Sequence, residues 1–156
     1  MRTFQRIIGV PGLNNLGVVR DGAVYRSAQP EYTAWATTLT GTIPISILNL
    51  REESMQTEVE AAGLKYFQLR LNVFSDVTVE DFDLVVQTLS ENQPILIHCL
   101  DGKNRTGVAC AAYRMAVDGW TLDEALEEMA AYGGDTIVDV ILRKHLEAYA
   151  EAKGFK

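Results

Sequence analysis

The chain has 156 residues, enough for one domain, and its 47% hydrophobic and 22% charged residues are typical of a globular protein. Its net charge of −7, without a cluster of Lys and Arg, argues against nucleic acid or an anionic membrane as a broad-surface partner. No apolar run approaches the ~18 residues of a membrane span, and residues 1–12 lack a signal-peptide core, so we expect a monomeric, cytoplasmic protein.

The first half of the chain alternates short apolar strands with helices. The pattern predicts strands over 22–27, 45–50 and 64–71, and helices over 31–39 and 55–62. A loop over 72–77 follows the third strand. Thr78 and Asp81 then have the spacing of a capping box, which predicts a helix that runs to about Ser90.

The second half begins with an apolar strand over 95–97 and continues with three helices. The first is expected over 105–117, the second from a capping box at Thr121 and Glu124 to about Gly133, and the third from 135 or 136 to about 152. Alternation first and helices last predict an α/β fold, a single domain over 1–156 with a mostly parallel central sheet and a C-terminal helical layer. Ligands of such sheets bind beyond the carboxyl ends of the strands.

The stretch 94–107, PILIHCLDGKNRTG, has the pattern of a strand, a loop and the start of a helix. A loop that leads into a helix aims backbone N–H groups and the positive end of the helix dipole at one point, which suits an oxyanion. We therefore expect a phosphate to bind to the loop residues Leu100, Asp101, Gly102, Lys103, Asn104 and Arg105.

The residue types of this loop suit phosphoryl transfer. A free thiol has a pKa of about 8.5, and a helix N-terminus with nearby cations lowers such values to about 3.5–7.5, so Cys99 is the candidate nucleophile. Arg105 can hold two phosphate oxygens through its planar fork. The Thr106 hydroxyl can stabilise the sulfur as a leaving group, and we expect His98 to brace the loop rather than to carry protons.

The run His98-Cys99-x-x-Gly102-x-x-Arg105-Thr106-Gly107 is similar to the signature HCxxGxxR[ST]G of the cysteine-dependent protein tyrosine and dual-specificity phosphatases. Residues 21–30 and 47–51 resemble the leading half of compact members, including bacterial ones and the inositol pyrophosphate phosphatases. The resemblance implies a protein tyrosine phosphatase-like fold and a phosphocysteine intermediate. It also implies phosphotyrosine, phosphoserine or phosphothreonine as substrates, without a metal or other cofactor.

The resemblance further implies a general acid on a loop upstream of the cysteine. In the family an Asp protonates the leaving group and afterwards activates water. The loop over 72–77 contains one acid, Asp76, which we assign to this role. Asp81 is the alternative, although acids in the first turn of a helix are favoured for capping alone.

The charges of the loop leave the substrate class open. Lys103 is similar to the loop lysines of inositol phosphate and lipid phosphatases, but Asp101 offsets its charge, and we expect Asp101 to pair with Lys103, Arg26 or Arg51. Phosphorylated proteins are the first prediction, and inositol phosphates or phosphoinositides are the alternative. A catalytically silent phosphate-binding module, or a thiol enzyme of rhodanese or arsenate-reductase type, would also use such a loop.

Two further residues have a functional and a structural interpretation. Arg51, at the carboxyl end of a predicted strand, is a candidate substrate contact, but Glu52 and Glu53 beside it make a surface salt bridge equally consistent. Cys110 lies on the helix that follows the loop, too far from Cys99 for a direct bridge without backbone movement. We interpret Cys110 as a small buried hydrophobic residue rather than a redox partner.

Overall fold

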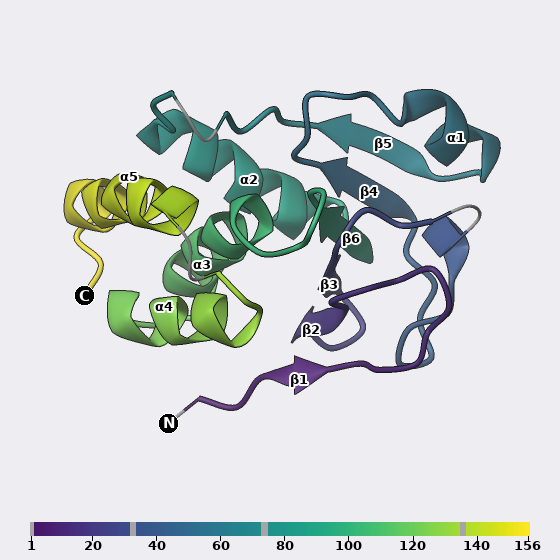
Figure 1. The fold of residues 1–156 in the computed structure, drawn as a ribbon, viewed down its shortest axis with the longest axis horizontal. Helices are drawn as coiled ribbons and strands as arrows, with labels where there is room; N and C mark the ends of the chain where they lie inside the picture. The colour runs from purple at the N-terminus through teal and green to yellow at the C-terminus, as the bar shows by residue number, and fades with distance from the viewer. Residues whose placement is uncertain (1, 32–33, 73–74, 135–136) are drawn as a thin grey trace.

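A computed structural model describes residues 2–31, 34–72, 75–134 and 137–156 and shows one mixed sheet packed with helices (Figure 1). The strand order is β1-β2-β3-β6-β4-β5. Each strand is short, and the bounds are β1 (Gln5–Arg6), β2 (Gly17–Arg20), β3 (Val24–Ser27), β4 (Ser46–Asn49), β5 (Lys65–Gln68) and β6 (Ile95–His98).

The four strands β3, β6, β4 and β5 pair in parallel, which confirms the α/β class and the parallel part of the sheet. The pairs β1–β2 and β2–β3 are antiparallel, and the sequence pattern did not indicate either of the first two strands. β1 has only two residues, both exposed, so it carries no alternation that a periodicity argument could detect.

Within the described ranges, five α-helices follow the predicted order, and their bounds are α1 (Gln56–Ala61), α2 (Val79–Glu91), α3 (Arg105–Val117), α4 (Leu122–Ala131) and α5 (Ile137–Lys153). Both capping boxes, at Thr78 and at Thr121, are confirmed with both of their hydrogen bonds. The predicted start of the third C-terminal helix, at 135 or 136, lies outside the described residues.

The helix predicted over 31–39 is wrong, because the described part of this segment holds only a short 3₁₀ turn over Ala34–Ala36. The Thr37 hydroxyl donates a hydrogen bond to the Ala34 carbonyl oxygen at 2.8 Å. Such local side-chain bonds compete with the helical ladder, and β-branched residues weaken it further.

Two hydrophobic clusters cover the two faces of the sheet. On β6, Ile95 and Ile97 belong to the cluster formed with α2, α3, α4 and α5, whereas Leu96 packs with Trp35 and the α1 side. Figure 1 shows the four large helices gathered on one side, with α3 in their middle. The residues of α3 from 106 to 115 are all buried, so α3 is fixed by packing on every side.

The active-site candidates lie at the carboxyl edge of the sheet because β6 is a central strand. His98, the last residue of β6, is paired with Ser27 of β3 and Asn49 of β4. The segments that leave β3, β4 and β6 therefore begin side by side at this edge. None of the described helices is long and apolar enough to cross a membrane.

Candidate active site

A pocket of about 410 Å³ opens at this edge of the sheet. We call residues 99–105 the phosphate loop, and five of them line the pocket together with the segments that follow β4 and β5. The lining residues are Arg51, Glu52, Glu53, Leu71, Asn72, Cys99, Leu100, Asp101, Asn104 and Arg105. The structure thus brings the predicted nucleophile and the predicted phosphate clamp into one cavity.

The carbonyl groups of the phosphate loop are held from outside the pocket. Four consecutive carbonyl oxygens accept hydrogen bonds, and none of the donors belongs to the pocket lining. The bonds are His98 Nδ1 to Cys99 O at 3.2 Å, Gln29 N to Leu100 O at 3.0 Å, Asn15 Nδ2 to Asp101 O and to Gly102 O at 3.2 Å each, and Arg26 Nη2 to Gly102 O at 3.0 Å.

This pattern determines where the loop N–H groups point. In a trans peptide the N–H group lies opposite the carbonyl group of the same unit. Because the carbonyls of 99–102 face outward, the N–H groups of 100–103 face the other way, toward the pocket. Several backbone N–H groups that converge at the N-terminus of α3 form an anion-binding site.

Gly102 is required for the turn of this loop. Its φ is +68°, a left-handed conformation that favours glycine. A Cβ atom at this position would lie 2.6 Å from Ala28 N and 2.7 Å from Ser27 C, both of them backbone atoms. The phosphate loop therefore packs directly on the end of β3, and no other residue fits there.

The His98 side chain is fully buried beside the ring of Trp35, with 5.6 Å between the ring centroids. Burial lowers the pKa of His98 to about 4, and the charges of Arg51 and Arg105 act in the same direction. The ring is therefore neutral at pH 7, and its Nδ1–H group donates to the Cys99 carbonyl oxygen. This contact supports the predicted bracing role.

Cys99 and Thr106 lie at the junction of the phosphate loop and α3. Cys99 is only 3% exposed, and α3 begins at Arg105. The buried Thr106 hydroxyl has no hydrogen-bond partner among the described residues. That hydroxyl is therefore available to donate a hydrogen bond to a sulfur atom at the start of the helix, as the sequence predicts.

Cys110 is a free, fully buried thiol on α3. Burial raises its pKa to about 11, so it is protonated at pH 7. These features agree with the interpretation of Cys110 as a small hydrophobic residue. No group of three His, Cys, Asp or Glu residues suited to a metal ion occurs in the described part of the chain.

Lys103 is not among the described residues that line the pocket, and its contact with phosphate stays a prediction. Its carbon atoms pack against Gly133, where an added Cβ would lie 3.1 Å from Lys103 Cε. Asp101 forms no ion pair with Lys103, Arg26 or Arg51 within the described ranges, which corrects the expected pairing. Its side chain lines the pocket instead.

Arg51 forms the predicted salt bridge and lies at the pocket, while its contact with a substrate stays a prediction. Its guanidinium lines the pocket and also pairs with the Glu53 carboxylate at 3.1 Å. Gln29 Oε1 accepts a longer hydrogen bond from Arg51 at 3.5 Å. Arg51 therefore places a cation at the pocket wall, beside the acids Glu52 and Glu53 of the same segment.

The two candidate acids have different surroundings. Asp76 is exposed in the segment between β5 and α2, and it does not line the pocket in this structure. The Asp81 carboxylate accepts a hydrogen bond from Thr78 N at 2.9 Å and so completes the capping box of α2. Asp81 thus has a structural task of its own, and the assignment of Asp76 as the general acid stays a prediction.

Sequence reasoning missed the residues that hold the loop from behind. Asn15 lies outside every motif in the sequence, and Gln29 lies in the stretch 21–30, whose resemblance to the family indicates no contact with the loop. For Arg26, which lies in the same stretch, the sequence predicts only a pairing with Asp101. A signal for Arg26 does exist, because a charged residue within an otherwise apolar strand must find a partner inside the protein.

Residues 10–153 match the model of a family described as "Tyrosine phosphatase family", and the chain belongs to this family. Over 48 residues it is 46% identical to the dual specificity protein phosphatase TpbA of Pseudomonas aeruginosa, which covers 31% of this chain and 22% of TpbA. Over 133 residues it is 34% identical to the inositol diphosphatase DSP3 of Arabidopsis thaliana, covering 78% of this chain and 63% of DSP3. The chain thus spans less than two thirds of either relative.

Solved structures show the same fold. The crystal structure of P. aeruginosa TpbA superposes with a TM-score of 0.77 at 24% identity and covers 97% of this chain and 96% of that one. The core catalytic domain of the PP-IP phosphatase SIW14 from S. cerevisiae gives a TM-score of 0.75 at 22% identity, covering 94% and 97%. The predicted protein tyrosine phosphatase-like fold is therefore confirmed.

Proposed function

We propose that the chain is a cysteine-dependent phosphatase that hydrolyses phosphomonoesters of tyrosine, serine or threonine through a phosphocysteine intermediate. The observation that carries the proposal is the outward orientation of the loop carbonyls, which turns the N–H groups of 100–103 toward the pocket that Cys99 and Arg105 line. An anion held by this loop would lie against the thiol. Membership in the tyrosine phosphatase family supports the same activity.

In the first step the Cys99 thiolate attacks phosphorus, and the bond between phosphorus and the ester oxygen breaks. Arg105 and the loop N–H groups stabilise the phosphoryl oxygens, and the leaving oxygen takes a proton from the Asp76 carboxylic acid. In the second step Asp76, now ionised, takes a proton from water, whose oxygen attacks phosphorus. The sulfur leaves as thiolate, stabilised by the Thr106 hydroxyl, and inorganic phosphate is released.

The charges around the pocket favour a substrate with one phosphate group. Of the described residues, three acids, Glu52, Glu53 and Asp101, line it together with two cations, Arg51 and Arg105. A second or third phosphate on the substrate would approach these acids, at an electrostatic cost. The relative TpbA is named a dual specificity protein phosphatase, which fits a substrate with one phosphate group.

Inositol phosphates are the second candidate substrate class. The match to the inositol diphosphatase DSP3 covers 78% of the chain, much more than the match to TpbA. Arg51 would contact the additional phosphate. In either case a catalytic thiol needs a reducing compartment to stay active, which supports a cytoplasmic location.

The experiment is a turnover panel with four substrate classes: phosphotyrosine peptide, phosphoserine/phosphothreonine peptide, phosphoinositide vesicles and soluble inositol phosphates. The Cys99→Ser protein is the control for contaminating phosphatase. We expect release of phosphate from the peptides by the wild type only. Binding of phosphate without turnover of any class would identify a silent phosphate-binding module and overturn the proposal.

A further inference from the structure

We propose that Asn15 and Arg26, which lie outside the signature motif, are positioning residues of the phosphate loop. They hold the carbonyl groups of Asp101 and Gly102 on the outer side, so that the N–H groups of Gly102 and Lys103 face the anion. The proposal rests on the proposed function for its catalytic meaning. Its physical content, the affinity of the loop for phosphate, can be measured without turnover.

Asn15 joins three parts of the chain through one amide. Its Nδ2 donates to the carbonyl oxygens of Asp101 and Gly102 at 3.2 Å each and to that of Tyr132 at 3.0 Å. Its Oδ1 accepts a hydrogen bond from Arg6 Nη2 at 2.5 Å. Because carbonyls only accept and guanidinium only donates, these partners fix which way the amide faces.

The backbone of Asn15 agrees with this specialised role. Its φ is +52°, a left-handed conformation in which Asn is several-fold enriched over other residues with a side chain. With this backbone conformation the Asn15 side chain, two residues before β2, reaches the phosphate loop. Few other residue types could supply both the conformation and a two-donor amide.

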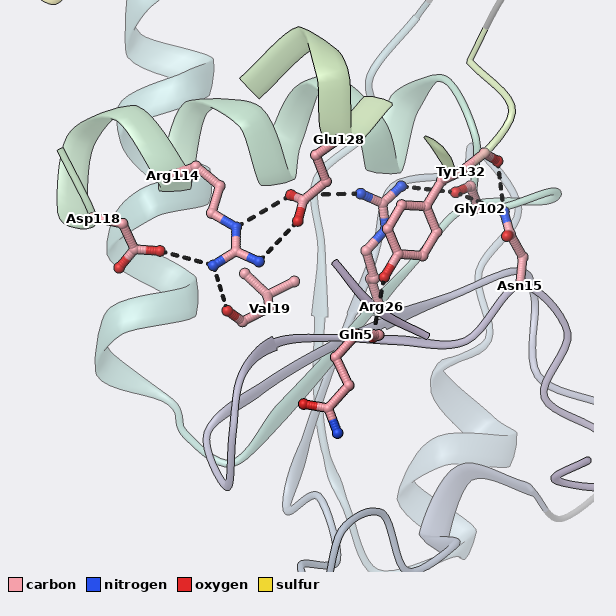
Figure 2. A network of polar contacts seen from close by, with 9 residues as sticks. All are labelled: Gln5, Asn15, Val19, Arg26, Gly102, Arg114, Asp118, Glu128 and Tyr132. Carbon is pink, nitrogen blue, oxygen red and sulfur yellow. Dashed lines mark hydrogen bonds and ion pairs between the residues drawn. The ribbon is translucent and has the colours of Figure 1, made fainter. Parts of the chain in front are cut away.

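Arg26 approaches Gly102 from β3 as a fully buried cation. Its Nη2 donates to Gly102 O at 3.0 Å, its guanidinium carbon lies 3.6 Å from the centroid of the Tyr132 ring, and its Nη1 lies 4.0 Å from Glu128 Oε1. Figure 2 shows the Arg26 guanidinium between Glu128 and Gly102, with the Tyr132 ring beside it. Burying a charge costs several kcal/mol unless it is compensated. Here the Glu128 carboxylate and the Tyr132 ring compensate the charge of Arg26.

Glu128 is itself fixed from the other side. Arg114 binds its carboxylate with two hydrogen bonds, of 3.2 and 2.8 Å, and also donates to Val19 O at 2.6 Å (Figure 2). Glu128 and Arg26 are both about 1% exposed. Arg114 thus holds the Glu128 carboxylate directly, whereas Arg26 reaches it only at 4.0 Å, so the closest contacts of the Arg26 fork are Gly102 O and the Tyr132 ring.

The phosphate loop needs such external donors because its central residue is glycine. Gly102 has no side chain to restrict the rotation of its two peptide units. If the peptide between Gly102 and Lys103 turned, its carbonyl oxygen would face the anion and its N–H group would be lost from the site. Two donors on one carbonyl oppose this rotation.

Two pairs of variants test the proposal, each with a matched control. Asn15→Gly removes the amide and keeps the left-handed conformation accessible, and Asn14→Gly makes the same change at the neighbouring exposed residue. Arg26→Lys keeps the charge near Glu128 but shortens the donor that reaches Gly102. Arg114→Lys makes the same change in the same ionic network at a side chain with no hydrogen bond to the loop.

Isothermal titration of the reduced full chain with inorganic phosphate is the main measurement, with the thermal midpoint of each variant measured in parallel. We expect Asn15→Gly and Arg26→Lys each to weaken phosphate binding by about tenfold, as loss of one charge-assisted or shared hydrogen bond implies. The two controls should bind within about twofold of the wild type, even where Arg114→Lys lowers the thermal midpoint.

The proposal is overturned if phosphate affinity follows the thermal midpoint, so that Arg114→Lys and Arg26→Lys lose affinity equally. It is also overturned if Asn15→Gly binds phosphate like Asn14→Gly. Failure of the proposed function has a different signature. A wild type that binds phosphate but hydrolyses none of the four substrate classes would overturn the function, while the affinities of the paired variants would still decide whether Asn15 and Arg26 position the loop.

Discussion

Replacing His98 by Asn should remove a specific part of the pH dependence of stability. Burial lowers the pKa of His98 from 6.5 to about 4 in the folded chain, whereas the unfolded chain keeps the ordinary value. Between these two values the unfolded state binds a proton that the folded state does not, so the free energy of unfolding falls as the pH falls. One pKa unit is worth about 1.4 kcal/mol, which gives a loss of about 2 kcal/mol between pH 7 and pH 5.

The assay is urea unfolding of the wild type and of His98→Asn at pH 7, 6 and 5, a range in which most carboxylates stay ionised. We expect the wild type to lose about 2 kcal/mol more than the variant over this range. His145 is present in both proteins and cancels in the comparison. Equal slopes would refute the reasoning, since they would mean that His98 titrates in the folded state as it does in the unfolded one.

Three further predictions concern the site itself. Asp76→Asn should slow hydrolysis of a phosphotyrosine peptide by about 10²–10⁴-fold but scarcely affect the first step with an aryl phosphate whose phenol is acidic, because only the poor leaving group needs a proton. The matched Asp81→Asn should show no such dependence on the leaving group in pre-steady-state assays, and the reverse result would move the acid to α2. Gly102→Ala should abolish phosphate binding and destabilise the fold, because its Cβ would meet backbone at 2.6 Å, whereas Gly119→Ala, at a similar φ of +69° with open space around it, should cost about 1 kcal/mol in urea unfolding. Equal effects of the two glycine substitutions would contradict the close approach of the loop to β3. A chelator should leave phosphatase activity unchanged, while vanadate and mild peroxide should inhibit it, the latter reversibly by added thiol; restoration of a chelated sample by a divalent ion would contradict this.

The sequence was sufficient for those features that depend on neighbouring residues. The strand before Cys99, the start of α3 at Arg105 and the two capping boxes all follow from periodicity and from spacings of three residues. The parallel part of the sheet follows from the alternation of strands and helices. Local physical chemistry decides each of these features, so no knowledge of distant contacts was needed.

The features that the sequence did not predict depend on contacts between distant parts of the chain. β2 is a strand because β3 offers an edge with which it pairs, and β1 pairs in turn with β2; neither segment carries a strong signal of its own. Lys103 turns toward Gly133 because α4 ends there, and no spacing in the loop indicates that direction. Asn15 reaches Gly102 over a separation of 87 residues, which only the folded chain reveals.

The central claim, that Cys99 carries the phosphoryl group, is tested most directly by trapping the intermediate. The wild type is mixed with an aryl phosphate, quenched within the first turnovers and digested, and the peptide that contains Cys99 is analysed by mass spectrometry. The account predicts one added phosphoryl group on Cys99, which should accumulate further in Asp76→Asn because hydrolysis of the intermediate is slowed. Full turnover by Cys99→Ser, or phosphate release with no modified peptide at any quench time in either protein, would contradict it.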